Sequence, residues 1–165
     1  VYVMGVSGCG KTVVGAELAR RLGGTFIDGD DLHPAANKRK MGAGLPLDDC
    51  DRAPWFAAIQ RAVADGEERP VVVACSALKR AYRDTLRAGR ARAVFVFLSG
   101  DYDLIMARIQ QRDHEYMPPG LLRSQFDTLE VPTPDERVVE VDISPSVAEI
   151  VENLLSRLAT DDGTV

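Results

Sequence analysis

A glycine-rich octet near the start of the chain has the residue types needed to hold a triphosphate. It consists of Gly5, Val6, Ser7, Gly8, Cys9, Gly10, Lys11 and Thr12, and matches every fixed position of a phosphate-binding loop. Glycines that adopt positive φ turn successive backbone N–H groups inward at a helix N-terminus, forming an anion nest. We expect Lys11 to reach the β- and γ-phosphates of ATP and the Thr12 hydroxyl to bind Mg²⁺. An ordinary glycine-rich turn would not require the flanking strand and helix patterns, and both are present.

Two carboxylates follow the second apolar run, at Asp28 and Asp30. Such a pair could hold Mg²⁺ through water and accept a proton from a substrate hydroxyl. The spacing alone is equally compatible with a turn that caps a helix near Ala35, but the position beside the phosphate loop favours function. We expect Asp28, at the strand end, to serve the metal. Asp30 projects further and is expected to act as the base.

Basic side chains at two places could bind an anionic substrate and the transferring phosphate. Lys79 and Arg83 lie four residues apart on one helical face. Arg108 and Arg112 have the same spacing and precede the segment 113–120, which we interpret as a lid hinge. Arginines on a closing lid would stabilise charge on the phosphoryl group and exclude water. Solvated basic faces and a basic last helical turn are the alternatives, and the latter explains Arg112 more easily than Arg108.

Short apolar runs alternate with amphipathic helical patterns, which is typical of βαβ units with a parallel sheet covered by helices on both faces. The predicted strands are Val1–Met4, Thr25–Asp28, Pro70–Cys75, Ala93–Leu98 and Arg137–Asp142. Gly23-Gly24 predicts the end of the first helix, and Pro54 predicts the start of another near a cap at Asp51. In such sheets ligands lie beyond the carboxyl ends of the strands, where the candidate residues follow.

Length and composition indicate one globular domain. The chain has 165 residues, 45% hydrophobic and 27% charged, which is enough for a sizeable core. We predict a single domain over 1–159, with a lid at about 108–125 and a frayed tail at 160–165. The net charge of −5 gives no electrostatic basis for binding nucleic acid, and no apolar run reaches the length of a membrane span. We therefore expect a soluble protein without nucleic-acid or membrane partners.

The three cysteines, Cys9, Cys50 and Cys75, have neither metal-ligand spacing nor the density of a disulfide scaffold. A reducing, cytoplasmic location fits this pattern. Cys9 lies inside the predicted anion nest, where positive potential would favour the thiolate and lower its pKa. The alternative is that Cys9 is a small, inert filler in a tight loop.

Along nearly its whole length the chain resembles the gluconate kinases, within the nucleoside-monophosphate-kinase-like and shikimate-kinase-like group. The phosphate loop alone discriminates little, because many proteins share it. The specific stretches are Asp28-Gly29-Asp30, Pro46-Leu47-Asp48-Asp49 and Cys75-Ser76-Ala77-Leu78-Lys79.

The resemblance implies ATP-dependent transfer to the 6-hydroxyl of D-gluconate, giving 6-phospho-D-gluconate and ADP. It also implies a three-layer α/β/α fold, a five-stranded parallel sheet of order 2-3-1-4-5, a mobile lid and, frequently, a homodimer. The positions that match the sugar-acid pocket are Asp30, Arg52, Lys79 and Arg83. Arg108 and Arg112 match lid arginines, and Arg108 is also expected to contact ATP. Cationic donors suit the gluconate carboxylate, and a base suits its reacting hydroxyl.

Other activities remain open from the sequence. A shikimate or nucleotide kinase would share the loop, the sheet and the lid, and a nucleotide-dependent switch would bind nucleotide without a small acceptor. Cys75-Ser76 ends the third strand without the acidic residue usual in motor ATPases. Asn37-Lys38-Arg39-Lys40 lacks the aspartate of a guanine-recognition motif. These absences argue against a motor and a guanine-specific switch.

Overall fold

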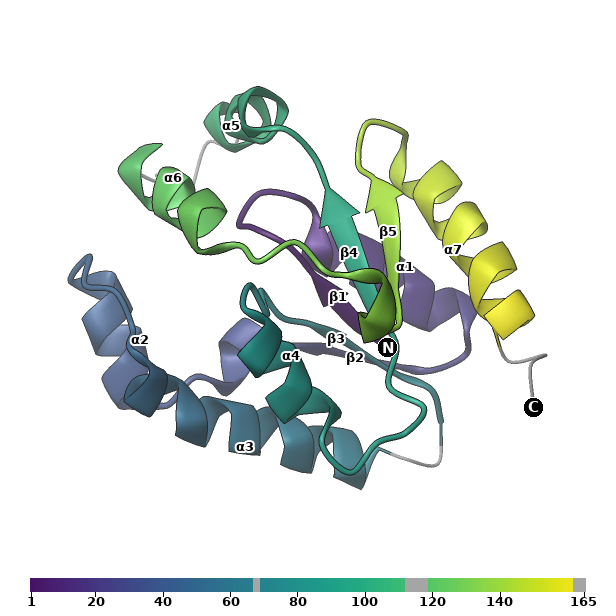
Figure 1. The fold of residues 1–165 in the computed structure, drawn as a ribbon, viewed down its shortest axis with the longest axis horizontal. Helices are drawn as coiled ribbons and strands as arrows, with labels where there is room; N and C mark the ends of the chain where they lie inside the picture. Colours follow the sequence, from purple (N-terminus) through teal and green to yellow (C-terminus); the bar gives the residue numbers. More distant parts are fainter. Residues whose placement is uncertain (67–68, 112–118, 162–165) are drawn as a thin grey trace.

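Five parallel strands form the centre of the computed structural model, which describes residues 1–66, 69–111 and 119–161. The strand order is β2-β3-β1-β4-β5, as expected, and every neighbouring pair is parallel (Figure 1). The strands are β1 (Tyr2–Met4), β2 (Thr25–Asp28), β3 (Val71–Ala74), β4 (Phe95–Ser99) and β5 (Val138–Asp142). Each overlaps its predicted range, so the predicted α/β fold is confirmed.

Helices connect the strands. The α-helices are α1 (Lys11–Arg21), α2 (Ala35–Gly42), α3 (Asp49–Asp65), α4 (Arg80–Arg87), α5 (Tyr102–Gln110), α6 (Pro119–Thr128) and α7 (Val147–Asp161). Two 3-10 turns, η1 (Gly29–Leu32) and η2 (Pro134–Glu136), follow β2 and precede β5. No helix in the described ranges is both long and apolar enough to cross a bilayer.

Alternating strand side chains build two buried layers, one on each face of the sheet. Val3 belongs to the same cluster as Leu18 of α1 and Leu154 of α7. Tyr2 and Met4 point the other way, into a cluster that includes side chains of α3 and α4. Figure 1 accordingly shows α7 on one side of the sheet and α3 and α4 on the other. This two-residue alternation is what a sheet covered on both faces requires.

The start of α3 differs from the prediction. The helix begins at Asp49, with Asp48 as its N-cap, so Pro54 lies inside the first two turns rather than at the start. Asp48 and Asp51 form a capping box, in which each carboxylate accepts from the other residue's backbone N–H. The predicted cap residue Asp51 is therefore the third helical residue. The end of α1 is as expected, with Gly23 at φ 64° just beyond it.

Helices α5 and α6 lie together beyond the carboxyl end of β4 (Figure 1). Leu122 of α6 is fully buried in the core cluster, and Phe126 packs edge-on against Tyr102 of α5 at 5.6 Å between ring centroids. The C-terminal part of the predicted lid is therefore a helix attached to the core. Arg112 and the segment 112–118 lie outside the described residues.

Candidate functional site

The phosphate loop has the backbone conformation that its glycines predict. Gly5, Gly8 and Gly10 have φ of 141°, 82° and 101°, and α1 begins directly after Gly10. A Cβ at Gly8 would lie 2.6 Å from the side chain of Ile109, so α5 packs directly onto the loop. These glycines are needed both for conformation and for that close approach.

Lys11 folds back over the loop that precedes it. Its ammonium donates to the carbonyl oxygen of Val6 at 3.0 Å. The side chain is half-buried at the first position of α1. A cation held across the nest lies where phosphate oxygens would need neutralising.

Thr12 and Asp28 meet beside the loop. The Thr12 hydroxyl donates to Asp28 Oδ2 at 2.9 Å, and the backbone N–H of Asp30 donates to Asp28 Oδ1 at 3.1 Å. A hydroxyl and one carboxylate suit Mg²⁺, which keeps several waters and binds mainly through substrate phosphates. The described ranges contain no group of three or more His, Cys, Asp or Glu side chains arranged to hold a metal. A Mg²⁺ site of this kind does not require such a group, because water and phosphate oxygens supply the other ligands.

Trp55 fixes the turn that carries Asp30. Its indole N–H donates to the carbonyl of Gly29 at 2.6 Å, and its ring stacks on His33 at 4.0 Å between centroids. Burial lowers the pKa of His33 to about 4, so this imidazole is neutral near pH 7. Trp55 and His33 thus pack together and hold η1 in place.

Arg52 and Lys79 come together around Tyr82. The Arg52 guanidinium carbon and the Lys79 ammonium each lie 5.3 Å from the Tyr82 ring centroid. The Tyr82 hydroxyl donates to Asp49 Oδ1 at 2.6 Å, and Lys79 lies 3.7 Å from that carboxylate. The hydrogen bond from Tyr82 lowers the pKa of Asp49, with help from both cations. The result is a cationic cluster of Arg52 and Lys79 on an aromatic ring.

Arg83 does not lie where the sequence placed it. Its side chain is 0% exposed and forms a two-pronged ion pair with Glu136, at 2.6 Å from Nε and 2.9 Å from Nη2. Its remaining terminal nitrogen donates to the carbonyls of Ala77 and Leu78. A guanidinium enclosed in this way offers no face to a substrate carboxylate. We therefore replace the expected contact with a positioning role for Arg83.

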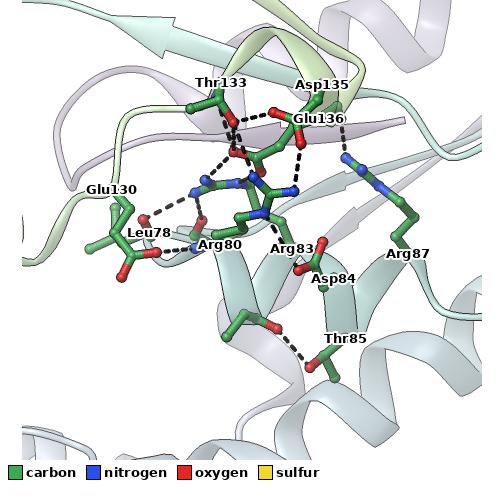
Figure 2. A network of polar contacts seen from close by, with 12 residues as sticks. Leu78, Arg80, Arg83, Asp84, Thr85, Arg87, Glu130, Thr133, Asp135 and Glu136 are labelled. Carbon is green, nitrogen blue, oxygen red and sulfur yellow. Dashed lines mark hydrogen bonds and ion pairs between the residues drawn. The ribbon is translucent and has the colours of Figure 1, made fainter.

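The Arg83–Glu136 pair sits in a wider polar network between α4 and the segment before β5 (Figure 2). The backbone N–H of Arg80, at the start of α4, donates to Glu130 at 2.6 Å. The Arg80 guanidinium binds Asp135 at 2.7 Å and Thr133 at 3.2 Å. These bonds hold the start of α4, and with it Lys79, against the chain that returns from α6.

Arg108 is tied to the end of the sheet. Its guanidinium donates to the carbonyl of Ile143 at 2.7 Å, just after β5. Its positive charge partly offsets the rise that burial causes in the pKa of Cys9 of the phosphate loop, and it adds to the hydrogen bonds from Ser144 that lower the pKa of Asp142. Arg108 thus lies close enough to the loop for an electrostatic role, whereas Arg112 is outside the described residues.

The two buried cysteines are unsuited to reaction as thiolates. Cys9 is 1% exposed, and burial raises its pKa more than the nearby Lys11 and Arg108 lower it. The filler reading of Cys9 therefore fits the structure, and the reactive-thiolate hypothesis does not. Burial raises the pKa of Cys75 to about 12. The charges of Asp30, Lys11 and Asp28 also act on Cys75, so this thiol lies near all three.

Sequence reasoning missed four residues of the site region: Asp49, Tyr82, Gln125 and Glu136. Asp49 lies in one of the stretches that carry the resemblance, but neither Asp49 nor Tyr82 was assigned a role from the sequence. Gln125 and Glu136 act on residues 118 and 53 positions away, respectively. A single sequence carries no signal for such pairings.

A family model described as shikimate kinase matches residues 7–159. The thermosensitive gluconokinase of Escherichia coli (strain K12) is 46% identical over 153 residues, covering 91% of this chain and 82% of that protein. The gluconokinase of Gluconobacter oxydans (strain 621H) is 43% identical over 166 residues, covering 98% and 92%.

Solved structures are also similar to this chain. A gluconokinase from Sinorhizobium meliloti 1021 matches with a TM-score of 0.88 at 48% identity, over 96% of this chain and 90% of that one. A shikimate kinase from Aquifex aeolicus vf5 matches with a TM-score of 0.62 at 19% identity, over 99% and 98%. The second likeness shows the fold alone.

We predict that only Cys50 reacts quickly with a thiol reagent in the native protein. Cys50 is exposed, whereas Cys9 and Cys75 are buried and have raised pKa values. Labelling with an aromatic disulfide should show one fast thiol before denaturant is added and three after. A Cys50→Ser variant should lose the fast phase. Rapid labelling of Cys9 in that variant would contradict the assignment of Cys9 as a buried filler.

A second prediction concerns Glu136. Replacement by Ala leaves the buried Arg83 charge unpaired, which should lower the free energy of unfolding by roughly 3–5 kcal/mol. Arg80→Ala is the matched control, because its pair with Asp135 is exposed and should contribute less than about 1 kcal/mol. Denaturant unfolding at pH 7 measures both. Equal losses in the two variants would show that the buried pair does not govern this region.

The stabilisation by Glu136 should also depend on pH. The hydrogen bonds from Arg83 hold the pKa of Glu136 at about 2, below its ordinary value of 4.5. A lowered carboxyl pKa means that the stabilisation is complete above pH 4.5 and is lost as the pH falls toward 2. The difference in unfolding free energy between wild type and Glu136→Ala should therefore shrink over that interval. A constant difference would rule out this linkage.

Proposed function

This chain belongs to the gluconokinase family, and on that basis we propose that its site transfers the γ-phosphoryl group of ATP to the 6-hydroxyl of D-gluconate. The products are 6-phospho-D-gluconate and ADP. Identities of 46% and 43% to gluconokinases over nearly the whole chain support this activity. The roles of individual residues below are our assignments.

The observation that carries the proposal is that one loop joins the phosphate nest to the cationic cluster. The loop 75–79 follows β3, and its Ser76 carbonyl accepts a hydrogen bond from the backbone N–H of Gly5 at 3.3 Å. The same loop ends at Lys79, which lies with Arg52 on the ring of Tyr82. We assign the hydroxyl end of the substrate to the nest and its carboxylate end to the cationic cluster.

The donor side is formed by the nest and Lys11. In the proposed mechanism the backbone N–H groups of Gly8 and Gly10 and the residues that follow bind phosphate oxygens. Lys11 already lies across the loop, 3.0 Å from Val6 O. Its ammonium would stabilise the charge that develops on the oxygens of the leaving ADP and the transferring group.

Thr12 and Asp28 would hold the metal. Their oxygens lie 2.9 Å apart beside the nest and fit Mg²⁺ as described above. When bound, Mg²⁺ neutralises charge on the β- and γ-phosphates. Asp28 also fixes the turn η1 through the N–H of Asp30, so the two carboxylates are held in one geometry.

Asp30 would take the proton of the attacking hydroxyl. It is exposed at the first turn after β2, whereas Asp28 is half-buried against Thr12. The hydroxyl oxygen forms the new bond to phosphorus while the bond from phosphorus to the ADP oxygen breaks, and the proton passes to the Asp30 carboxylate. A carboxylate suits a reaction in which that proton leaves late.

Arg52 and Lys79 would bind the carboxylate of gluconate. Both are half-buried, and Asp49 lies close enough to Lys79 to hold it when no substrate anion is present. Charge-assisted hydrogen bonds from two cations give both affinity and orientation at the end of the substrate far from the reaction. Arg83 would contribute indirectly, because it holds the carbonyls of Ala77 and Leu78 next to Lys79.

Arg108 would add positive charge near the phosphates, and Arg112 keeps its expected role on the lid. A homodimer and a cytoplasmic location also remain proposals that follow from the resemblance. None of these is needed for the chemistry assigned to Lys11, Asp30, Arg52 and Lys79.

The direct test is an ADP-release assay over gluconate, other aldonates, shikimate and nucleoside monophosphates. We expect gluconate to give the highest kcat/KM. Lys11→Ala should lower kcat by at least about a hundredfold with the fold intact, because it removes one charge aimed at the transition state and no core packing. Higher turnover on shikimate or a nucleotide would overturn the substrate assignment. Near-wild-type turnover of Lys11→Ala would remove the loop from the mechanism.

A further prediction separates the two carboxylates. Asp30→Asn should lower kcat by roughly a hundredfold or more while leaving the affinities for ATP and Mg²⁺ almost unchanged. Asp28→Asn should instead raise the Mg²⁺ concentration needed for half-maximal activity, because Asp28 is paired with Thr12. Initial rates over a Mg²⁺ series measure both effects. Rescue of Asp30→Asn by high Mg²⁺, without rescue of Asp28→Asn, would exchange the two roles.

A further inference from the structure

Gln125 of α6 binds the phosphate loop through both atoms of its side-chain amide. The backbone N–H of Ser7 donates to Gln125 Oε1 at 2.7 Å, and Gln125 Nε2 donates to Ser7 Oγ at 3.0 Å. This orientation of the amide satisfies both contacts. If the amide were flipped, its NH₂ group would face the Ser7 N–H, and two donors would meet. Helix α6 therefore contacts the phosphate loop at Ser7, through a residue 118 positions further along the chain.

Gln125 and Lys11 bind the same peptide group of the loop. The planar unit between Val6 and Ser7 has its carbonyl bound by the Lys11 ammonium at 3.0 Å and its N–H bound by Gln125 at 2.7 Å. Because a peptide group is rigid and planar, fixing its N–H also fixes the direction of its C=O. Gln125 thus determines where the acceptor of Lys11 points.

Gln125 reaches the loop from a fixed helix. On α6, Leu122 is fully buried and Phe126 packs on Tyr102. Just beyond the helix, the N–H of Glu130 donates to the carbonyl of Leu78 at 2.9 Å. A side chain that starts from a backbone anchored in this way can hold its partner in one place.

We propose that Gln125 is a positioning residue for Lys11, acting through the Val6–Ser7 peptide. The proposal rests on the proposed function, in which Lys11 stabilises the transferring phosphoryl group. Gln125 sets the curvature of the loop before nucleotide arrives, so that ATP binds to a nest and a lysine already in place. It acts on the nucleotide side only, because its contacts do not reach the Arg52, Lys79 and Tyr82 cluster.

The test replaces Gln125 with Met, which has a similar length and volume but neither hydrogen bond. We expect the dissociation constant of a non-hydrolysable ATP analogue to rise about tenfold, as for one or two lost hydrogen bonds, and kcat to fall. KM for gluconate should stay within about twofold. The exposed Asp127 on the same helix supplies the control Asp127→Asn, which should leave all three quantities unchanged.

A double-mutant cycle with Ser7→Ala separates positioning from general loss of structure. The Ser7→Ala and Gln125→Met effects on analogue binding should be non-additive, because the hydroxyl contact that Ser7→Ala removes is already absent in Gln125→Met. Additive effects, an unchanged analogue affinity, or a rise confined to gluconate KM would each overturn the proposal. If Gln125→Met does not fold, Gln125→Asn decides: its amide is one methylene shorter and is withdrawn from the Ser7 N–H, and an unchanged analogue affinity in that variant would refute the role.

The binding measurement uses no acceptor, so its result does not depend on which substrate is phosphorylated. Failure of the proposed function would appear in the substrate panel with wild-type protein. Failure of the positioning role would appear as analogue binding that Gln125→Met does not weaken.

Discussion

A guanidinium that no water reaches must find its partners within the protein, and Arg83 meets this requirement with Glu136 and the carbonyls of Ala77 and Leu78. Removing two charges from water is costly unless their geometry and remaining hydrogen bonds compensate. Here a two-pronged pair and two carbonyl acceptors do so. Ala77 has φ of 43°, a left-handed conformation that costs a non-glycine residue about 1–2 kcal/mol. The Arg83 bonds hold that turn, so the shape of the loop 75–79 depends on this pair.

The two halves of the proposed site meet at that loop. Its Ser76 carbonyl accepts the N–H of Gly5, at the start of the phosphate loop, and its last residue is Lys79 of the cationic cluster. The chain returning from α6 covers the loop, because Glu130 binds both Leu78 and Arg80. Donor and acceptor groups are thus spaced by backbone contacts rather than by flexible side chains. Transfer between two bound substrates requires such fixed spacing, since a small displacement of either one slows the reaction.

The sequence predicted the sheet and the phosphate loop well, because each depends on local patterns. Apolar runs located all five strands, and the glycines of the octet have the expected positive φ. Arg83 shows the limit of this approach. Its type and helical spacing were visible, but Glu136 lies 53 residues away and its burial depends on the packed fold. The hypothesis of a reactive Cys9 thiolate was wrong for a related reason. The sequence showed that Cys9 lies in the nest, but not that packing would bury its side chain and raise its pKa.

The residues that select the acceptor can be sought by separating the features that this chain shares with other kinases of the same fold from those that lie outside the shared nucleotide site. The shikimate kinase from Aquifex aeolicus vf5 has this fold at 19% identity, so the sheet and its helices do not by themselves select the acceptor. In our assignment the phosphate loop and the Thr12–Asp28 contact serve the nucleotide. The side chains that the assignment leaves for the acceptor are Arg52 and Lys79, which both lie over the ring of Tyr82. These three residues come from α3, from the loop after β3 and from α4, so the proposed acceptor side depends on how these two helices are held against the sheet. The Arg83–Glu136 pair touches no substrate in our assignment, but it holds the loop that ends at Lys79 and the helix that carries Tyr82, so in the proposed site its loss would affect acceptor binding as well as stability.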